Sequence, residues 1–224
     1  MQIQEVERFR LSSRLLHWVV TASFLILALT GLFLYIPQLG VVAQDGYTRA
    51  IHRIVAVIFI GAPLIYFLAA PKNTLSFLKE VFTWGKDDIE WFKAAPDYYF
   101  GGEASLMPPQ GAMNTGQKLW ALVSVVGGIG FLVTGILMWA FKGESSGLFL
   151  ASIFVHDVCF IVVGSFMLVH FYLGVIHPRM TESMRSMITG SVSVEYAESH
   201  HGKWLRERGM VEVAEETPSA EREG

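Results

Sequence analysis

The chain has 224 residues, of which 52% are hydrophobic and 17% charged, and its formal net charge is −3. This composition is more apolar and less charged than that of an ordinary soluble domain, and we expect no nucleic-acid partner. The single cysteine, Cys159, excludes an intramolecular disulfide and any metal or iron–sulfur site that needs several cysteines.

Four long apolar runs occupy about residues 15–36, 54–70, 119–141 and 153–176. Each approaches or reaches the roughly 20 residues that a helix needs to cross the hydrocarbon core of a bilayer. The first run is too long for a signal peptide and is not followed by an A-x-A-like cleavage site, so we expect it to remain as a span. The sequence therefore predicts an all-α integral membrane four-helix bundle in residues 1–177, with a cytoplasmic tail in residues 178–224.

Positive charges are distributed unevenly among the five segments outside these runs. The segments before the first run, between the second and third, and after the fourth hold 14 Lys and Arg residues, whereas the other two segments hold three. Positively charged loops favour the cytoplasmic side. We therefore predict that both termini and the central loop face the cytoplasm, in the inner membrane of a bacterium.

The central loop, residues 72–118, is too long for a simple connection. Its first part has apolar residues at helical spacing, followed by aromatic residues suited to a membrane interface: Phe77, Leu78, Val81, Phe82, Trp84, Trp91 and Phe92. We predict one or two amphipathic helices on the cytoplasmic surface. The last segment, residues 211–224, is acidic and lacks aromatic residues, so it is predicted to be disordered.

Two histidines lie in the fourth apolar run. His156 and His170 are separated by nearly four helical turns, which puts them about 40° apart on one face and about 21 Å apart along the axis. An ionisable group inside a membrane span is costly and normally faces the bundle interior or a cavity. Two histidines on one face at two depths therefore predict two sites.

Two further histidines supply a partner at each depth. His17 begins the first span, which enters from the cytoplasm, and His52 begins the second span, which enters from the periplasm. Depth therefore pairs His17 with His170 and His52 with His156, and it argues against one four-histidine cluster. Two pairs of neutral imidazoles fit the axial ligation of iron in two b-type haems.

Other residues near these depths have less specific explanations. His177 precedes a proline at the membrane surface, where a position beside headgroups or haem propionates suits it better than ligation. His200 and His201 fall in the tail and are not expected to bind haem. Several glycines in the spans could give a flat ring room or could serve ordinary helix packing: Gly31, Gly61, Gly127, Gly128, Gly130, Gly164 and Gly174.

Five motifs carry a family resemblance: RLLHW (14–18), RAIH (49–52), MNTGQKLW (113–120), VTGILMW (133–139) and the H-x13-H pattern of the fourth span. Together they resemble the cytochrome b, or gamma, subunit of respiratory formate dehydrogenases, within the wider family of bacterial dihaem cytochromes b561 and Ni-Fe hydrogenase cytochromes b. The resemblance runs from about Arg8 to Arg208, and it implies the same two histidine pairs as haem ligands. One departure is Arg53, which follows the histidine of the second span where a member of the family has a proline.

The resemblance also implies a quinone site beside the inner haem, lined by Asn114, Gly116 and Gln117, for menaquinone or ubiquinone. An amide can donate a hydrogen bond to a quinone carbonyl. The residues taken alone also suit a turn that caps the third helix.

The function implied by the resemblance is electron conduction. Electrons would arrive from a periplasmic iron–sulfur subunit bound to a catalytic dehydrogenase subunit, cross the membrane through two haems, and reduce a quinone near the cytoplasmic side. A higher oligomer of the lipid-embedded complex is compatible with this scheme. Three alternatives remain open: a cytochrome b serving a Ni-Fe hydrogenase or thiosulfate reductase, a stand-alone cytochrome b561-type carrier, and a haem-free anchor or transporter.

Overall fold

The computed structural model describes residues 4–101, 107–141 and 146–210, so the predicted disorder of residues 211–224 concerns a segment outside the described part. The chain forms two compact units. We call the described residues of 5–84 and 116–192 the transmembrane unit, and residue 4 with the described residues of 85–115 and 193–210 the polar unit.

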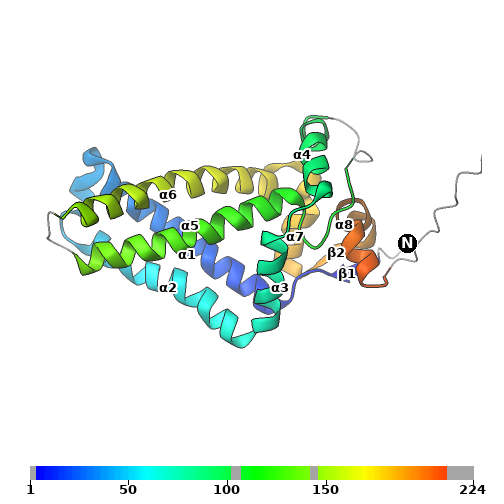
Figure 1. The fold of residues 1–224 in the computed structure, drawn as a ribbon, viewed down its shortest axis with the longest axis horizontal. Coiled ribbons are helices and arrows are strands. Elements are labelled where there is room, and N and C mark those ends of the chain that lie inside the picture. The colour runs from blue at the N-terminus through cyan, green and yellow to red at the C-terminus, as the bar shows by residue number, and fades with distance from the viewer. Residues whose placement is uncertain (1–3, 102–106, 142–145, 211–224) are drawn as a thin grey trace, which may run out of the picture. The chain divides into compact units, whose positions relative to one another are not determined.

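Four long helices build the transmembrane unit (Figure 1): α1 (Leu11–Tyr35), α2 (Tyr47–Ala69), α5 (Thr115–Ala140) and α6 (Gly147–Phe171). All four are long and apolar enough to cross a membrane, which confirms the predicted all-α membrane fold. Each helix begins before its apolar run. In α2, for example, the first turns include Arg49, His52 and Arg53, because a helix extends beyond the hydrocarbon core into the polar interface.

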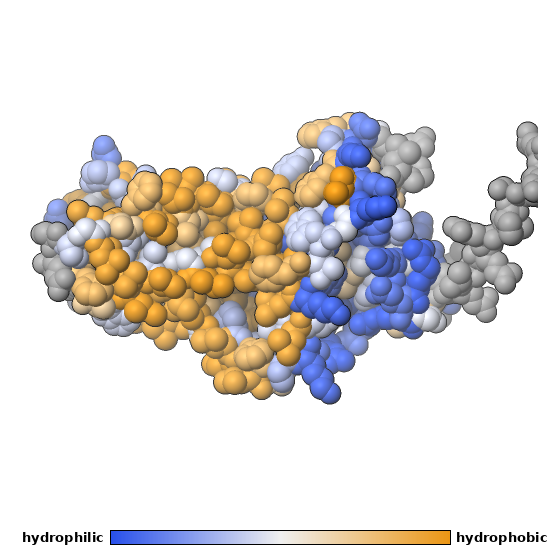
Figure 2. Space-filling view, viewed as in Figure 1, coloured by the Kyte–Doolittle hydropathy of each residue, from blue (hydrophilic) through white to orange (hydrophobic). Residues whose placement is uncertain are grey.

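The outer surface of these helices is apolar. Large side chains such as Leu68 and Leu168 are 79% and 72% exposed, and Figure 2 shows apolar residues covering the long helices. In water such a surface would drive aggregation, whereas lipid tails solvate it at no cost. The helices satisfy their own backbone hydrogen bonds, as a lipid environment requires. The protein is therefore an integral membrane protein.

Small residues bring α5 close to α6. A Cβ atom added to Gly127 would collide with Cγ2 of Val163, and one added to Gly130 would lie 2.7 Å from Sγ of Cys159. These two glycines therefore serve helix packing, which is one of the two roles expected for the glycines of the spans. By contrast, an added Cβ atom at Gly128 would meet no atom within 4 Å among the described residues.

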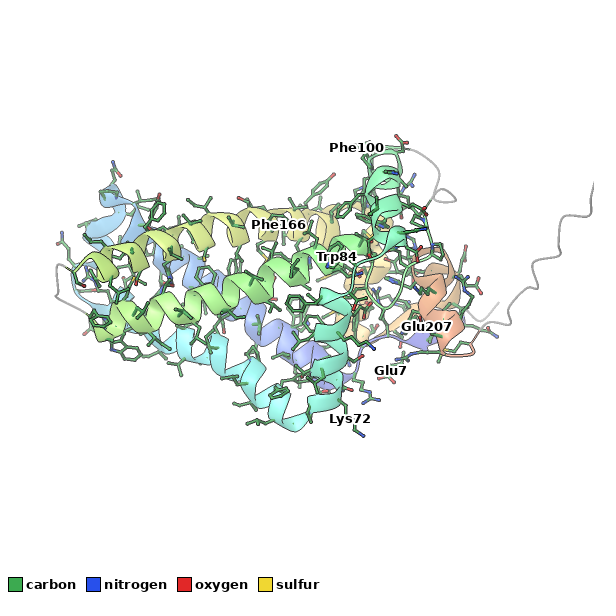
Figure 3. The ribbon with its side chains drawn as sticks, viewed as in Figure 1. Glu7, Lys72, Trp84, Phe100, Phe166 and Glu207 are labelled. Atoms are coloured by element: carbon green, nitrogen blue, oxygen red, sulfur yellow. The ribbon has the colours of Figure 1, made fainter. Side chains whose placement is uncertain are left out.

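Shorter elements complete the transmembrane unit. The helix α3 (Pro71–Phe82) begins with a proline at a position that suits its fixed φ, and Figure 3 marks Lys72 near its start. After α6 come a π-helical turn η3 (Tyr172–Ile176), a 3-10 turn η4 (Pro178–Met180) and the helix α7 (Thr181–Thr189). The connection between α1 and α2 contains the 3-10 helix η1 (Pro37–Ala43).

A two-stranded sheet, which the sequence analysis did not predict, joins β1 (Glu5–Glu7) to β2 (Ser191–Ser193). Beside it, the backbone N–H groups of Arg8 and Phe9 both donate to the carbonyl oxygen of Gly190, at 2.8 and 3.0 Å. Gly190 has a φ of +100°, and an added Cβ atom would lie 2.9 Å from the Phe9 carbonyl oxygen. Only glycine fits this turn.

The polar unit contains α4 (Lys86–Tyr99) and α8 (Val194–Glu207). The carboxylate of Asp88 accepts from the N–H of Gly85 and from the hydroxyl of Thr115, both at 2.8 Å. It therefore caps α4 and ties it to a later segment of the chain. Two helices, α3 and α4, thus lie in the central loop as predicted. Their position on the cytoplasmic surface remains a prediction.

Aromatic contacts join α4 to α8. The Tyr98 hydroxyl lies 2.6 Å from Nε2 of His200, and the Tyr196 ring stacks on the His200 ring with centroids 4.1 Å apart. Nδ1 of His201 lies 2.9 Å from the carbonyl oxygen of Gly111. Both histidines of the tail therefore take part in packing within the polar unit.

Candidate functional site

The transmembrane unit brings its histidines together in two pairs. The ring centroids of His52 on α2 and His156 on α6 lie 6.4 Å apart, and those of His17 on α1 and His170 on α6 also lie 6.4 Å apart. These are the two pairs that helix depth predicts. We call His52 and His156 the outer pair, and His17 and His170 the inner pair.

The spacing within each pair suits one metal ion between two imidazoles. A ring nitrogen lies about 1 Å from its centroid and about 2 Å from a bound metal, so ligands on opposite sides of one ion have centroids about 6 Å apart. The described residues contain no group of three or more His, Cys, Asp or Glu side chains that could hold a metal. Two imidazoles without a third protein ligand fit an iron ion whose other ligands come from a porphyrin.

Each ring of the outer pair contacts a threonine on a neighbouring helix. Oγ1 of Thr30 on α1 lies 2.8 Å from Nδ1 of His52, and Oγ1 of Thr134 on α5 lies 2.8 Å from Nδ1 of His156. With Nδ1 occupied, Nε2 is the nitrogen that each ring can offer to iron.

The sequence analysis missed both threonines, although a signal was present. Each precedes a glycine, in Thr30-Gly31 and Thr134-Gly135, and each stands 22 residues before its histidine. The same Thr-Gly…His arrangement therefore occurs once in α1 and α2 and once in α5 and α6.

Aromatic rings pack against the inner pair. The Trp120 ring on α5 stacks on the His170 ring with centroids 5.0 Å apart and planes 17° apart, and Trp18 meets His17 edge-on at 5.2 Å. Nδ1 of His17 is buried and has no hydrogen-bond partner among the described residues. The two pairs thus share a spacing but differ in what surrounds their rings.

Two residues flank the outer pair. A Cβ atom added to Gly31 would lie 3.7 Å from Cε1 of His52, so Gly31 lies at the level of this pair. The Arg53 guanidinium, next to His52 in sequence, lies 5.8 Å from the ring centroid of Trp139 on α5. This cation–π contact holds a positive charge in the N-terminal turns of α2.

The candidate quinone residues lie where α5 begins. Asn114 is buried at the end of one segment of the polar unit, and Gly116 and Gln117 belong to the first turn of α5. Oε1 of Gln117 accepts a hydrogen bond from Nη2 of Arg8 at 3.3 Å. Gln117 stands three residues before Trp120 and therefore lies on the same helix face as the ring that stacks on His170.

The basic side chain of Lys118, in the first turns of α5, contacts the segment that follows α3. Nζ of Lys118 donates to the Thr83 carbonyl oxygen at 2.6 Å and lies 4.9 Å from the ring centroid of Trp84, which Figure 3 marks after the end of α3. His177, at the end of η3, is buried and its ring meets Tyr172 edge-on at 6.0 Å. The structure thus gives Lys118 and His177 packing contacts in the transmembrane unit.

Comparison with known proteins gives these pairs a family context. A model of the family described as prokaryotic cytochrome b561 matches residues 8–190. The cytochrome b556 subunit of formate dehydrogenase from Haemophilus influenzae is 25% identical over 218 residues, which cover 93% of this chain and 86% of that protein.

Two proteins of Escherichia coli are similar over nearly the same length. The cytochrome b556(Fdn) subunit of the nitrate-inducible formate dehydrogenase is 26% identical over 217 residues, which cover 95% of each chain. The cytochrome b556(fdo) subunit of formate dehydrogenase is 22% identical over 209 residues, which cover 90% of this chain and 92% of that protein. The family resemblance drawn from the sequence motifs is confirmed. The chain belongs to the prokaryotic cytochrome b561 family, whose members are haem b proteins of the membrane.

Proposed function

We propose that the chain is the membrane cytochrome b subunit of a respiratory formate dehydrogenase, which takes electrons from a periplasmic iron–sulfur subunit and delivers them through two b haems to a quinone near the cytoplasmic side. The observation that carries this proposal is the presence of two histidine pairs with the same 6.4 Å spacing in one bundle. The similar cytochrome b556 subunits belong to formate dehydrogenases, which supports formate dehydrogenase as the partner.

In this proposal His52 and His156 hold the outer haem, and His17 and His170 hold the inner haem. Bound haem iron supplies one-electron transfer at two depths of the membrane. The protein contributes neutral imidazoles on long helices and keeps water away from them. Because α6 supplies one ligand to each pair, it also sets their separation, with His156 and His170 about 21 Å apart along its axis.

The quinone would bind beside the inner pair, against Asn114, Gly116 and Gln117. A guanidinium can only donate hydrogen bonds, so Arg8 holds the oxygen of the Gln117 amide toward itself. An amide NH₂ has two N–H donors, and a quinone carbonyl accepts a hydrogen bond from such a group. Menaquinone and ubiquinone both have such carbonyls, and the proposal covers both.

The proposed topology follows from the distribution of positive charge. Both termini and the central loop lie on the cytoplasmic side of the bacterial inner membrane. Residues 1–177 are the transmembrane dihaem domain and residues 178–224 the cytoplasmic tail, in which α7 belongs to the transmembrane unit and α8 to the polar unit. The iron–sulfur and catalytic subunits then meet the opposite, periplasmic side.

Substitution of single histidines tests the haem assignment. His52→Ala and His156→Ala should each remove the same one of two haems, and His17→Ala and His170→Ala should each remove the other. The haem-to-protein ratio and the dithionite-reduced spectrum of the purified subunit measure this result. His200→Ala, in the polar unit, is the matched control and should retain both haems. Two haems remaining after any of the four substitutions would contradict the assignment.

The catalytic partner is tested in membranes that contain the whole complex. Formate should reduce the haems of the subunit, and a quinone-site inhibitor should slow their reoxidation by quinone. Reduction by hydrogen but not by formate would instead identify a hydrogenase as the partner. Reduction by neither would reject both assignments.

A further inference from the structure

The two threonines at the outer pair are held in a fixed hydrogen-bonding role. The Thr30 hydroxyl donates to the carbonyl oxygen of Ile26 at 2.8 Å, and the Thr134 hydroxyl donates to that of Gly130 at 2.6 Å. A hydroxyl has one hydrogen to donate. When that hydrogen goes to the preceding turn of its own helix, each threonine oxygen accepts from Nδ1–H of its histidine, which is the tautomer that leaves Nε2 for a metal.

This direction fixes the tautomer of both rings. His52 and His156 each carry a proton on Nδ1 and leave the lone pair of Nε2 for a metal. Thr30 and Thr134 are 7% and 4% exposed. Hydrogen bonds at such buried positions in a membrane span do not compete with water, so they keep the His52 and His156 rings in one orientation.

In the part of the chain that the structure describes, no threonine hydroxyl contacts a ring of the inner pair. Nδ1 of His17 is buried without a hydrogen-bond partner among the described residues, and the His170 ring is packed by the flat face of Trp120. An acceptor on Nδ1–H makes an imidazole a stronger electron donor and stabilises the higher oxidation state of a bound metal. Haems held at the two levels would therefore differ in redox potential.

We propose that Thr30 and Thr134 are positioning residues that lower the midpoint potential of the outer haem below that of the inner haem. This inference rests on the proposed function, because it assumes one haem at each histidine pair. It adds a driving force to the direction of electron transfer already proposed. Through the rings of His52 and His156 the two hydroxyls lower the potential of the outer haem, so electrons that enter there move downhill to the inner haem.

The test is a potentiometric measurement of both haems in the purified subunit. Thr30→Val and Thr134→Val keep the side-chain shape and remove the acceptor. Each should raise the midpoint potential of the outer haem, with a change of up to about tenfold in the ferrous-to-ferric ratio at fixed potential, or about 59 mV for one electron. The His52→Ala variant shows which component belongs to the outer pair. The inner component should not move.

Two matched variants separate this role from a structural one. Thr30→Ser restores the hydroxyl and should return the potential to that of the original protein. Thr74→Val removes the same kind of hydroxyl, which bonds to the Ala70 carbonyl oxygen at 3.3 Å in α3, and should change neither potential. If both valine variants fail to retain the outer haem, retention by Thr30→Ser with an unshifted potential still supports the role.

The outcomes also separate this inference from the proposed function. Two bound haems with an outer potential unchanged or lowered in Thr30→Val and Thr134→Val would overturn the inference and leave the haem assignment intact. A shift of the inner component, or an equal shift in Thr74→Val, would overturn it as well. A protein that binds no haem, or only one per chain, would reject the proposed function itself.

Discussion

The close contact between α5 and α6 can be tested by adding one methyl group to Gly127. The added Cβ atom would collide with Cγ2 of Val163, a residue that is 4% exposed. A valine in a helix has one strongly preferred χ1 rotamer, so relief requires Val163 to leave that rotamer or the two helices to move apart. Overpacking of this kind costs typically about 1–3 kcal/mol. We therefore expect Gly127→Ala to lower the free energy of unfolding by about that amount, in spite of the better helix propensity of alanine.

A double-mutant cycle isolates the collision. Val163→Ala alone leaves a cavity and should also destabilise the protein, but it removes the atom that the new methyl group meets. The double variant should therefore lose less free energy of unfolding than the two single variants lose together. The difference, which is the coupling energy, should be about 0.5–3 kcal/mol. Reversible unfolding in mixed micelles by increasing SDS, followed by far-ultraviolet circular dichroism, measures each free energy.

The matched control is Gly128→Ala on the same helix. A Cβ atom there would meet nothing within 4 Å among the described residues, so the substitution should be neutral or should stabilise by up to about 1 kcal/mol. If the effects of Gly127→Ala and Val163→Ala simply add, or if Gly128→Ala costs as much as Gly127→Ala, the described packing of α5 on α6 is wrong.

Three further predictions concern other parts of the chain. Asp88→Ala removes the cap of α4 and should cost about 0.5–2 kcal/mol in unfolding free energy, whereas Asp87→Ala in the same turn should cost little. Gly190→Ala places a side chain at a φ of +100° beside a carbonyl oxygen and should cost about 1–3 kcal/mol, measured by thermal unfolding in detergent. Trp120→Leu removes the ring stacked on His170, a contact worth about 0.5–1.5 kcal/mol, and should speed loss of the inner haem to apomyoglobin while the outer haem stays bound.

Each of these has a result that would count against it. If Asp88→Ala and Asp87→Ala lower the free energy of unfolding equally, negative charge near the start of α4 stabilises the helix and the capping hydrogen bond does not. Gly209 has a φ of +63°, and an added Cβ atom there would meet no atom within 4 Å in the part of the chain that the structure describes. Gly209→Ala should therefore cost less than Gly190→Ala, and the reverse order would show that crowding at Gly190 is not the cause. Faster loss of the outer haem in Trp120→Leu would contradict the placement of Trp120 at the inner pair.

Hydropathy and helix rise predict which segments span the membrane and at what depth each histidine lies. Long apolar runs identify the four spans because lipid imposes a minimum length, and the number of residues from each helix end gives the level of each histidine. The pairs His17–His170 and His52–His156 could be deduced in this way. Whether they bind haem is a prediction that the histidine variants test.

The orientation of each helix about its own axis could not be predicted from the sequence in this way. The contact of Thr30 with His52 depends on how α1 turns toward α2, and that of Trp120 with His170 on how α5 turns toward α6. Apolar residues surround each span, so no amphipathic pattern shows which side faces inward. The β1–β2 sheet was not predicted for another reason. Strands of three residues are too short to show an alternating pattern of apolar and polar residues.

The contact of Val163 with Gly127 also bears on what can cross the membrane through the seam between α5 and α6. Val163 stands halfway along α6 between His156 and His170, and Cys159 lies against Gly130 just outside it. A proton needs a continuous chain of water molecules or polar groups to move along. The direct packing of the Val163 side chain on the Gly127 backbone provides no such chain at this level. Electron tunnelling does not need one. Under the proposed function, this contact would therefore hinder the return of protons along the seam while electrons pass between the two histidine pairs.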